Sequence, residues 1–130
     1  MLDLDNFKPF NDTFGHEAGD SMLRHLAQML REKLRKSDIS CRYGGDEFVL
    51  VLPDSSLTDT EQRVQQICNL VKELQVRHGG RPLSTISVSA GVVDAREQGS
   101  TAVELLQEAD NAMYAAKQAG GDRVVVYQGK

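Results

Sequence analysis

Residues 41–52 read CRYGGDEFVLVL, and this stretch decides the fold. Gly44 and Gly45 separate two runs of strand-forming residues, which predicts a β-hairpin. We expect a two-residue turn of type I′ here, because that turn needs positive φ at both central positions and glycine adopts it without a Cβ clash. Asp46 and Glu47 follow at once, so two carboxylates emerge beside backbone that carries no side chains. A phosphate or a metal ion could approach closely, although an ordinary polar hairpin tip explains the same residues.

The segments around this hairpin alternate between helical and strand periodicity. Thr58 with Glu61 and Thr101 with Glu104 form capping-box patterns, each followed by an apolar stripe at helical spacing. Glycine pairs are expected to end both of these helices. In chain order we expect a strand at 1–5, a short helix within 6–14, a helix at 16–35, the hairpin at 39–52, a helix from 58 to the glycines at 79–80, a strand at 86–92 with one face buried, a helix from 101 to the glycines at 120–121, and a strand at 124–127.

This order of elements predicts an α+β fold. We expect an antiparallel or mixed central sheet with the flanking helices packed on one side, close to the ferredoxin-like and polymerase-palm architecture. A chain of 130 residues without internal repeats or low-complexity stretches is expected to form a single domain.

Composition excludes several classes of protein. With 40% hydrophobic and 26% charged residues the chain is typical of a globular protein rather than a disordered one. A net charge of -4 provides no basic surface for polymeric nucleic acid. Cys41 and Cys68 fall in a predicted strand and on the apolar face of a predicted helix, which favours a reduced, cytoplasmic setting over a disulfide framework. No apolar run reaches membrane-spanning length.

Residues 42–48, RYGGDEF, resemble the signature of the GGDEF domain family, the diguanylate cyclases. DLDNFK at residues 3–8, Asn11 with Asp12, and GHEAGD at residues 15–20 resemble the family's first strand, phosphate loop and guanine-reading helices, in order and spacing. The resemblance runs from Met1 to about Gln128. It implies a domain over residues 1–130 that lacks the family's N-terminal helix and part of its first strand.

The resemblance implies a reaction in which two GTP molecules are condensed into cyclic di-GMP and two pyrophosphates. Each domain of a homodimer would hold one GTP. If the first strand lies beside the hairpin, Asp3 and Asp46 can share hard divalent cations, which prefer oxygen ligands and keep waters for substrate phosphates. The implied ligands of two Mg²⁺ or Mn²⁺ ions are Asp3, Asp46 and the Leu4 carbonyl, and Asp46 or Glu47 would assist deprotonation.

Phosphate binding is expected at the start of the short helix. The turn formed by Asn6, Phe7 and Lys8 can aim backbone N–H groups at the β- and γ-phosphates. Lys8 adds a cation there, and Lys117 could add a second, while Gly44 and Gly45 leave room for the nucleotide.

The chain departs from the family near its end, where many members place an arginine directly after a glycine. Here Gly120-Gly121-Asp122-Arg123 stands instead. Either Arg123 reaches the phosphates from two residues later, or Lys117 acts alone.

Guanine presents adjacent N1–H and N2–H donors that one carboxylate can accept, and adenine offers the wrong pattern on that edge. Asp20 is the candidate acceptor and Asn11 the candidate for another edge, both matching the family's guanine contacts. His16 is expected to order the turn that leads to Asp20 more than to touch the substrate.

Arg35 and Asp38 form an Arg-x-x-Asp sequence separated from Gly44 by five residues, where the family's product-inhibition site lies. An arginine fork can bind a phosphate or guanine O6 and N7, and a carboxylate accepts from a guanine edge. The resemblance thus implies inhibition by cyclic di-GMP. A local ion pair between Arg35 and Asp38 is the simpler explanation.

Two other functions stay open on the sequence. A catalytically weak or inactive module that binds GTP or cyclic di-GMP, or that dimerises, would keep the fold, although the intact GGDEF residues argue against it. Another nucleotidyl cyclase or a palm-type polymerase fits the metal ligands but leaves Asp20 unexplained. The resemblance also implies an upstream sensory domain, and any membrane anchor would lie in missing N-terminal regions.

Overall fold

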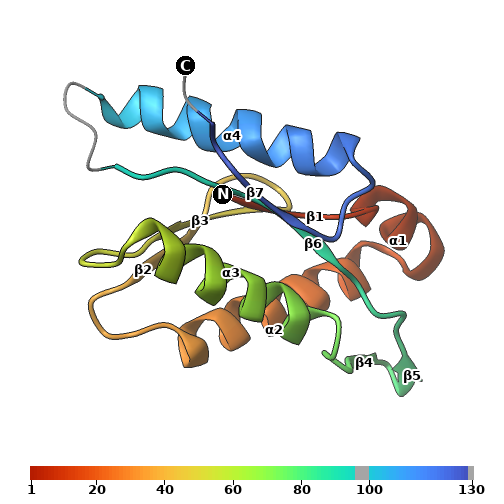
Figure 1. The fold of residues 1–130 in the computed structure, drawn as a ribbon. Coiled ribbons are helices and arrows are strands. Elements are labelled where there is room, and N and C mark those ends of the chain that lie inside the picture. Colours follow the sequence, from red (N-terminus) through yellow and green to blue (C-terminus); the bar gives the residue numbers. More distant parts are fainter. Residues whose placement is uncertain (96–99, 129–130) are drawn as a thin grey trace.

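A five-stranded mixed sheet forms the centre of the computed structural model, which describes residues 1–95 and 100–128 (Figure 1). The strand order is β2-β3-β1-β6-β7. The short central strand β1 is antiparallel to both of its neighbours, and β6 and β7 run parallel. The strands are β1 (Leu2–Leu4), β2 (Ile39–Arg42), β3 (Glu47–Val51), β6 (Val88–Val92) and β7 (Val124–Val126). The predicted mixed sheet is therefore confirmed.

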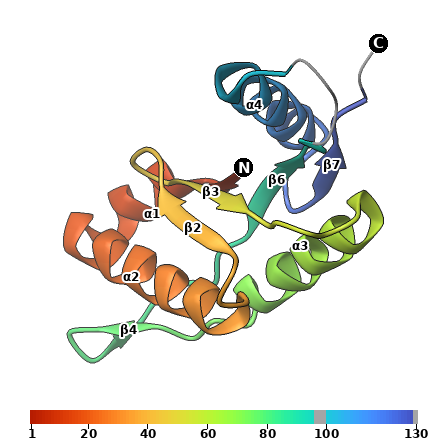
Figure 2. The same ribbon diagram turned by 90° about the vertical axis from the view of Figure 1, so that its left-hand side faces the viewer.

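Helices cover both faces of this sheet, so the expected packing on one side is wrong. The helices are α1 (Phe7–Phe14), α2 (His16–Lys33), α3 (Leu57–Val71) and α4 (Ala102–Gln118). Figure 2 shows α2 and α3 on one side of the strands and α4 on the other. Leu2 and Leu4 point to the first side, where they belong to the main core with α2 and α3. Asp3 and Asp5 alternate with them and face the side of α4.

The strand β6 is buried on both faces, which differs from the one-sided pattern expected from its alternation. Ser89 is fully buried although it is polar, because it donates a hydrogen bond to Asp5. Gly91 faces α4, and an added Cβ would lie 2.1 Å from the Ala109 carbonyl oxygen. The alternating small residues of β6 therefore indicate that α4 packs closely on this face of the strand, and not that the face is exposed to solvent.

The β2–β3 hairpin is confirmed, but its predicted type I′ turn is wrong. Neither Gly44 nor Gly45 has positive φ, and the connection spans residues 43–46. The Tyr43 and Gly44 amides both donate to the Glu47 carbonyl, at 2.8 and 3.4 Å. The Arg42 guanidinium donates to the carbonyls of both glycines and holds this wider loop.

Positive φ at two successive glycines occurs at Gly79 and Gly80 instead, with φ of 58° and 77°. These residues join two short strands that the sequence did not predict, β4 (Arg77–His78) and β5 (Arg81–Pro82). The preceding helix therefore ends at Val71 rather than at the glycines, and Val76 beyond it is buried in the core.

The two capping predictions had different outcomes. Ser56, and not Thr58, caps α3 by accepting from the Asp59 amide at 3.1 Å. Thr101 caps α4 as predicted, accepting from the Glu104 amide at 3.1 Å. Positive φ at Gly120 and Gly121 ends α4, also as predicted. Among the described residues, no helix is both long enough and apolar enough to span a lipid bilayer.

Candidate functional site

The first feature of the site is a cluster of carboxylates at the tip of the hairpin. The register of β1 and β3 pairs Asp3 with Glu47, and the Leu4 amide donates to the Asp46 carbonyl at 3.2 Å. The side chains of Asp3 and Asp46 are close enough to share a hydrogen bond. The structure thus brings together the two carboxylates that the sequence predicted to share a cation.

This cluster is short of positive charge. Burial raises the pKa of Asp3 to about 7, and the nearby Asp46 and Glu47 carboxylates raise it further, against the opposing effect of the Lys117 ammonium. Asp3 Oδ1 is buried and accepts no hydrogen bond. A divalent cation that bound here would reduce the repulsion among the carboxylates and give Asp3 Oδ1 a direct ligand.

The Lys117 ammonium from α4 contacts two of the three predicted metal ligands, the Leu4 carbonyl and the Asp3 carboxylate. Its Nζ donates to the Leu4 carbonyl at 3.1 Å and lies 3.4 Å from Asp3 Oδ1. A positive charge at this point shows that the donors suit a cation, and all of them are oxygens, as Mg²⁺ and Mn²⁺ prefer. The site therefore fits the metal that the sequence implied.

The described residues contain no group of three or more His, Cys, Asp or Glu side chains arranged to hold a metal. A divalent cation at this cluster would therefore depend on the Leu4 carbonyl, on water and on substrate phosphates for its remaining ligands. Mg²⁺ commonly binds through one or two carboxylates in this way.

The carboxylate of Asp5 was not predicted to belong to the site, yet it is the most heavily bonded acid beside it. It accepts hydrogen bonds from Ser87 and Ser89 at 2.7 and 2.6 Å and from the Asp122 amide at 2.8 Å. Burial alone would raise its pKa, but the hydrogen bonds from Ser89, Ser87 and the Asp122 amide, together with the Lys117 charge, lower the pKa of Asp5. Its partners are distant in sequence, so no local pattern could have identified them.

The expected phosphate loop lies directly after β1. Asn6 begins α1 in the left-handed conformation, with φ of 56°, and its side chain makes no capping hydrogen bond. The first backbone N–H groups of α1 therefore donate no hydrogen bond to the Asn6 side chain. Lys8 is exposed in the first turn, and Phe7 packs against the buried ring of Phe10. Asn6, Phe7 and Lys8 follow directly after the acidic end of β1, and their role in phosphate binding stays a prediction.

The two expected guanine contacts lie where α1 and α2 cross. A Cβ on Gly19 would lie 1.8 Å from Asn11 Oδ1, so the missing side chain allows the helices to touch. Asn11 Oδ1 is buried without a hydrogen-bond partner, and the neighbouring Asp20 is exposed. His16 is exposed at the start of α2. An unsatisfied amide oxygen near an exposed carboxylate can accept from a base that carries adjacent N–H donors.

Asp20 also lines a groove of about 380 Å³ between α2 and β2. Arg24 and Arg42 line the same groove. At the hairpin loop beside it, nothing lies within 4 Å of a Cβ added to Gly45. The predicted room for a ligand therefore exists at Gly45, whereas a Cβ on Gly44 would meet the Glu47 carboxylate at 2.6 Å.

The Arg-x-x-Asp segment does not form the simple ion pair considered for it. The Asp38 side chain is fully buried and accepts from the Arg35 backbone amide at 2.8 Å. Its ion-pair partner is Arg63 of α3, which sequence reasoning missed. Burial would raise the pKa of Asp38, but the hydrogen bonds from Arg63 and the Arg35 amide, together with the charges of both arginines, lower it. One oxygen of Asp38 and one nitrogen of Arg63 stay buried without partners.

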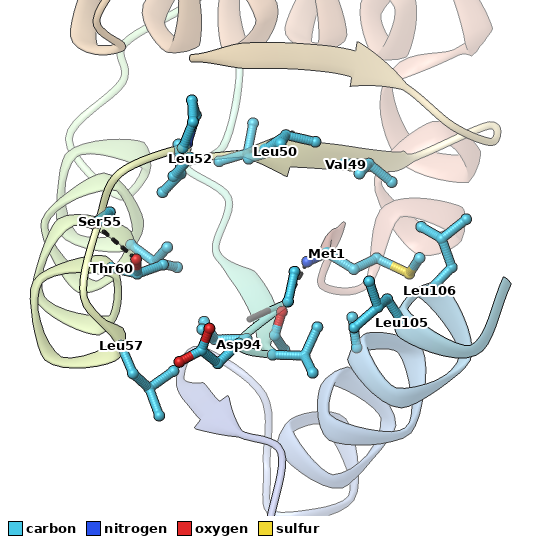
Figure 3. Close-up of a pocket in the computed structure, with 18 of the residues that line it drawn as sticks. Met1, Val49, Leu50, Leu52, Ser55, Leu57, Thr60, Asp94, Leu105 and Leu106 are labelled. Carbon is cyan, nitrogen blue, oxygen red and sulfur yellow. Dashed lines mark hydrogen bonds between the residues drawn. The ribbon is translucent and has the colours of Figure 1, made fainter. Parts of the chain in front are cut away.

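An apolar pocket of about 500 Å³ lies apart from all these residues, between β3, β6, α3 and α4 (Figure 3). Leu50, Leu57 and Leu105 are among its lining residues. The Met1 amino group donates to the Gly91 carbonyl at 2.7 Å, and burial lowers its pKa to about 6. A wall of this kind suits hydrocarbon and not a triphosphate.

Comparison with known proteins agrees with this geometry. The family model described as "Diguanylate cyclase, GGDEF domain" matches residues 1–123. The chain is 40% identical over 127 residues to the response regulator PleD of Caulobacter vibrioides, covering 96% of this chain and 28% of PleD. It is 41% identical over 126 residues to the diguanylate cyclase DgcP of Pseudomonas aeruginosa, covering 97% of this chain and 18% of DgcP.

A solved structure shares the fold as well. The GGDEF domain of DgcB from Caulobacter crescentus, in complex with c-di-GMP, matches with a TM-score of 0.91 and 31% identity, covering 98% of this chain and 75% of that one. The predicted α+β fold class is thereby confirmed. The chain spans less than a third of the length of PleD and of DgcP. Since the family model covers nearly all of its residues, the chain belongs to the GGDEF domain family of diguanylate cyclases.

Proposed function

We propose that this chain condenses two GTP molecules into cyclic di-GMP and two pyrophosphates. The observation that carries the proposal is that strand pairing brings the carboxylates of Asp3 and Asp46 together, where their repulsion helps to raise the pKa of Asp3, beside a loop with open space at Gly45. Support comes from the relatives named as diguanylate cyclases and from the DgcB domain in complex with c-di-GMP.

The chemistry required is attack of a ribose 3′-oxygen on the α-phosphorus of a second GTP. The bond between that phosphorus and the oxygen leading to the β-phosphate breaks, and pyrophosphate leaves. Asp46 or Glu47 would take the proton of the 3′-hydroxyl group. Asp3, Asp46 and the Leu4 carbonyl would hold two divalent cations, which when bound supply charge neutralisation for the phosphates and a lower pKa for the hydroxyl group.

The remaining residues bind and orient the triphosphate. The first amides of α1, with Lys8, would hold the β- and γ-phosphates, and the Lys117 ammonium beside the Leu4 carbonyl would add a second cation. Asn11 and Asp20 would select guanine, because adenine would leave these acceptors unpaired. One domain holds one GTP, so two copies of the chain must meet face to face for each ring to close.

We infer that Arg35 and Asp38 form a product-inhibition site. Arg35 is exposed and its backbone amide donates to the Asp38 carboxylate, so Asp38 would fix the segment and the Arg35 guanidinium would contact the product. Titration of cyclic di-GMP into the wild type and into Arg35→Ala tests this inference. Equal affinity in the two proteins would leave Arg35 a surface residue only.

A GTP-binding module without catalysis is the second candidate, and one observation favours it. Lys117 already neutralises part of the acidic cluster, as a site that binds nucleotide without turnover would allow. In longer relatives a sensory region would regulate such a module or an active domain. Both would function in the cytoplasm, where GTP is available.

Incubation with Mg²⁺ and GTP, followed by chromatography of the products, separates these functions. We expect cyclic di-GMP and pyrophosphate, with a rate per chain that rises with protein concentration because a homodimer is required. Asp46→Asn should abolish the product, while Glu61→Gln, an exposed carboxylate of α3, should not change it. Bound GTP without any product would favour the non-catalytic module, and the absence of GTP binding would overturn both candidates.

A further inference from the structure

We propose that Asp5 is a positioning residue, whose carboxylate anchors the Lys117 ammonium and the turn before Arg123 beside the acidic cluster. Asp5 is not itself one of the two carboxylates predicted to bind metal, Asp3 and Asp46. Its part is to hold cations where the phosphates would bind. The inference rests on the proposed function only for the nature of the ligand, a nucleoside triphosphate.

The Asp5 carboxylate is itself held rigidly. Its Oδ2 accepts from Ser87 Oγ at 2.7 Å and from the Asp122 amide at 2.8 Å, and its Oδ1 accepts from the buried Ser89 Oγ at 2.6 Å. The Asp5 backbone amide also donates to the Ser87 carbonyl at 2.9 Å. With both oxygens bonded, the carboxylate cannot rotate toward a partner, so a mobile cation must come to it.

The cation that does so is Lys117. Its Nζ lies 3.5 Å from Asp5 Oδ1, 3.1 Å from the Leu4 carbonyl and 3.4 Å from Asp3 Oδ1. Two of these three acceptors are predicted to bind a divalent cation. If they do, Asp5 is the remaining acceptor, and it keeps the Lys117 charge beside the phosphates instead of releasing the flexible side chain to solvent.

Asp5 also closes the turn after α4. The Asp122 amide donates to Asp5, and a Cβ on Gly121 would lie 3.1 Å from the Asp5 carboxylate, so this turn folds directly over the acid. Gly121 has a φ of 74°, which favours glycine. Its carbonyl accepts from Arg123 Nε at 3.0 Å. The second candidate phosphate cation, Arg123, is therefore placed by the same carboxylate.

A purely structural role is the competing explanation, because the same bonds link β1, β6 and the turn after α4. Comparing Asp5→Asn with two controls separates the two roles. Ser87→Ala removes one bond to Asp5 without changing charge, and Glu61→Gln removes an exposed carboxylate elsewhere. All variants are first compared with the wild type by thermal unfolding, so that only folded proteins are taken further.

The first measurement needs no nucleotide. In ¹H–¹³C spectra of protein with labelled lysine, the ε-methylene signal of Lys117 is assigned by its loss in Lys117→Met. We expect Asp5→Asn to sharpen this signal and move it toward that of an exposed lysine, with a smaller shift in Ser87→Ala, which keeps the charge of Asp5, and little change in Glu61→Gln. An unchanged Lys117 signal in folded Asp5→Asn would overturn the proposal.

The second measurement is calorimetric binding of two ligands in Mg²⁺: a GTP analogue with a methylene group between the α- and β-phosphorus atoms, and GMP. Loss of a residue that orients a binding group commonly costs about tenfold in affinity. We expect a loss of about this size for the analogue in Asp5→Asn and less than about a twofold change for GMP, which has no β- or γ-phosphate. The double variant with Lys117→Met should lose less affinity for the analogue than the two single losses add up to, because part of the Asp5 effect acts through Lys117.

Equal losses for the analogue and GMP would show a structural role only and overturn the proposal. If the wild type bound neither ligand, the proposed function would fail, while the lysine spectra would still decide whether Asp5 positions Lys117.

Discussion

Replacing Gly91 with alanine tests how closely α4 approaches the sheet. The added Cβ would lie 2.1 Å from the Ala109 carbonyl oxygen, 2.4 Å from the Met113 amide nitrogen and 3.0 Å from the Ala112 carbonyl carbon. Non-bonded heavy atoms keep about 3.5 Å apart, so the helix would have to retreat by about 1.4 Å at the tightest contact. All three neighbours are backbone atoms, and no side-chain rotation can make room.

Overpacking of a core costs about 1–3 kcal/mol, and we expect the upper end because the helix must move as a body. For a domain of this size, about 3 kcal/mol corresponds to a melting temperature lower by roughly 10 °C. Urea unfolding and calorimetry measure both quantities. Gly45→Ala is the matched control, because nothing lies within 4 Å of its Cβ and its φ is not positive; its unfolding free energy should change by less than about 0.5 kcal/mol. Wild-type stability of Gly91→Ala would refute the close packing of α4 on β6.

Three further predictions concern charge and specificity. Arg63→Ala should lower the free energy of unfolding by about 1–3 kcal/mol in urea, because it removes the ion-pair partner of Asp38 and leaves that carboxylate only the Arg35 amide; a change below about 0.5 kcal/mol would show that the pair is exposed in solution. The raised pKa of Asp3 means that the folded state binds a proton more tightly than the unfolded one, so without divalent cations this residue's contribution to stability is lost as pH rises from about 4 to 7. Subtracting the pH profile of Asp3→Asn should reveal that slope, and identical profiles would contradict the raised pKa. Asp20→Asn should reduce the preference for GTP over ATP in competition binding, and an unchanged ratio would remove Asp20 from the guanine site.

The acidic pair was predictable because its spacing depends on local rules. Alternation along β1 puts Asp3 and Asp5 on one face, and the hairpin brings Asp46 to the adjacent strand end. The backbone conformation of the glycine pairs was not predictable in the same way. Gly44-Gly45 and Gly79-Gly80 carry the same turn signal, yet only the second pair has positive φ. The two connections differ in length, because residues 43–46 join β2 to β3, whereas Gly79 and Gly80 alone join β4 to β5.

Contacts between distant residues escaped sequence reasoning for a different reason. Asp5 meets Ser87, Ser89 and Asp122 only because β1 lies beside β6 and the turn after α4 folds back over the strand ends. Arg63 reaches Asp38 from a helix whose apolar stripe predicted packing but no polar partner. Periodicity identifies which face of an element is buried, and it carries no information about which polar group lies opposite.

Packing and charge at the site depend on the same interface. The face of α4 that meets β6 carries the buried residues Ala109, Ala112 and Ala116, and the facing strand offers Ser89 and Gly91. Small side chains on both surfaces allow the backbones of α4 and β6 to approach closely, and this contact sets the distance between the helix and the sheet. Lys117 follows directly after Ala116, so the same approach brings its ammonium to the Leu4 carbonyl. A larger residue in this interface should therefore weaken triphosphate binding as well as stability, even though it contacts no part of the nucleotide.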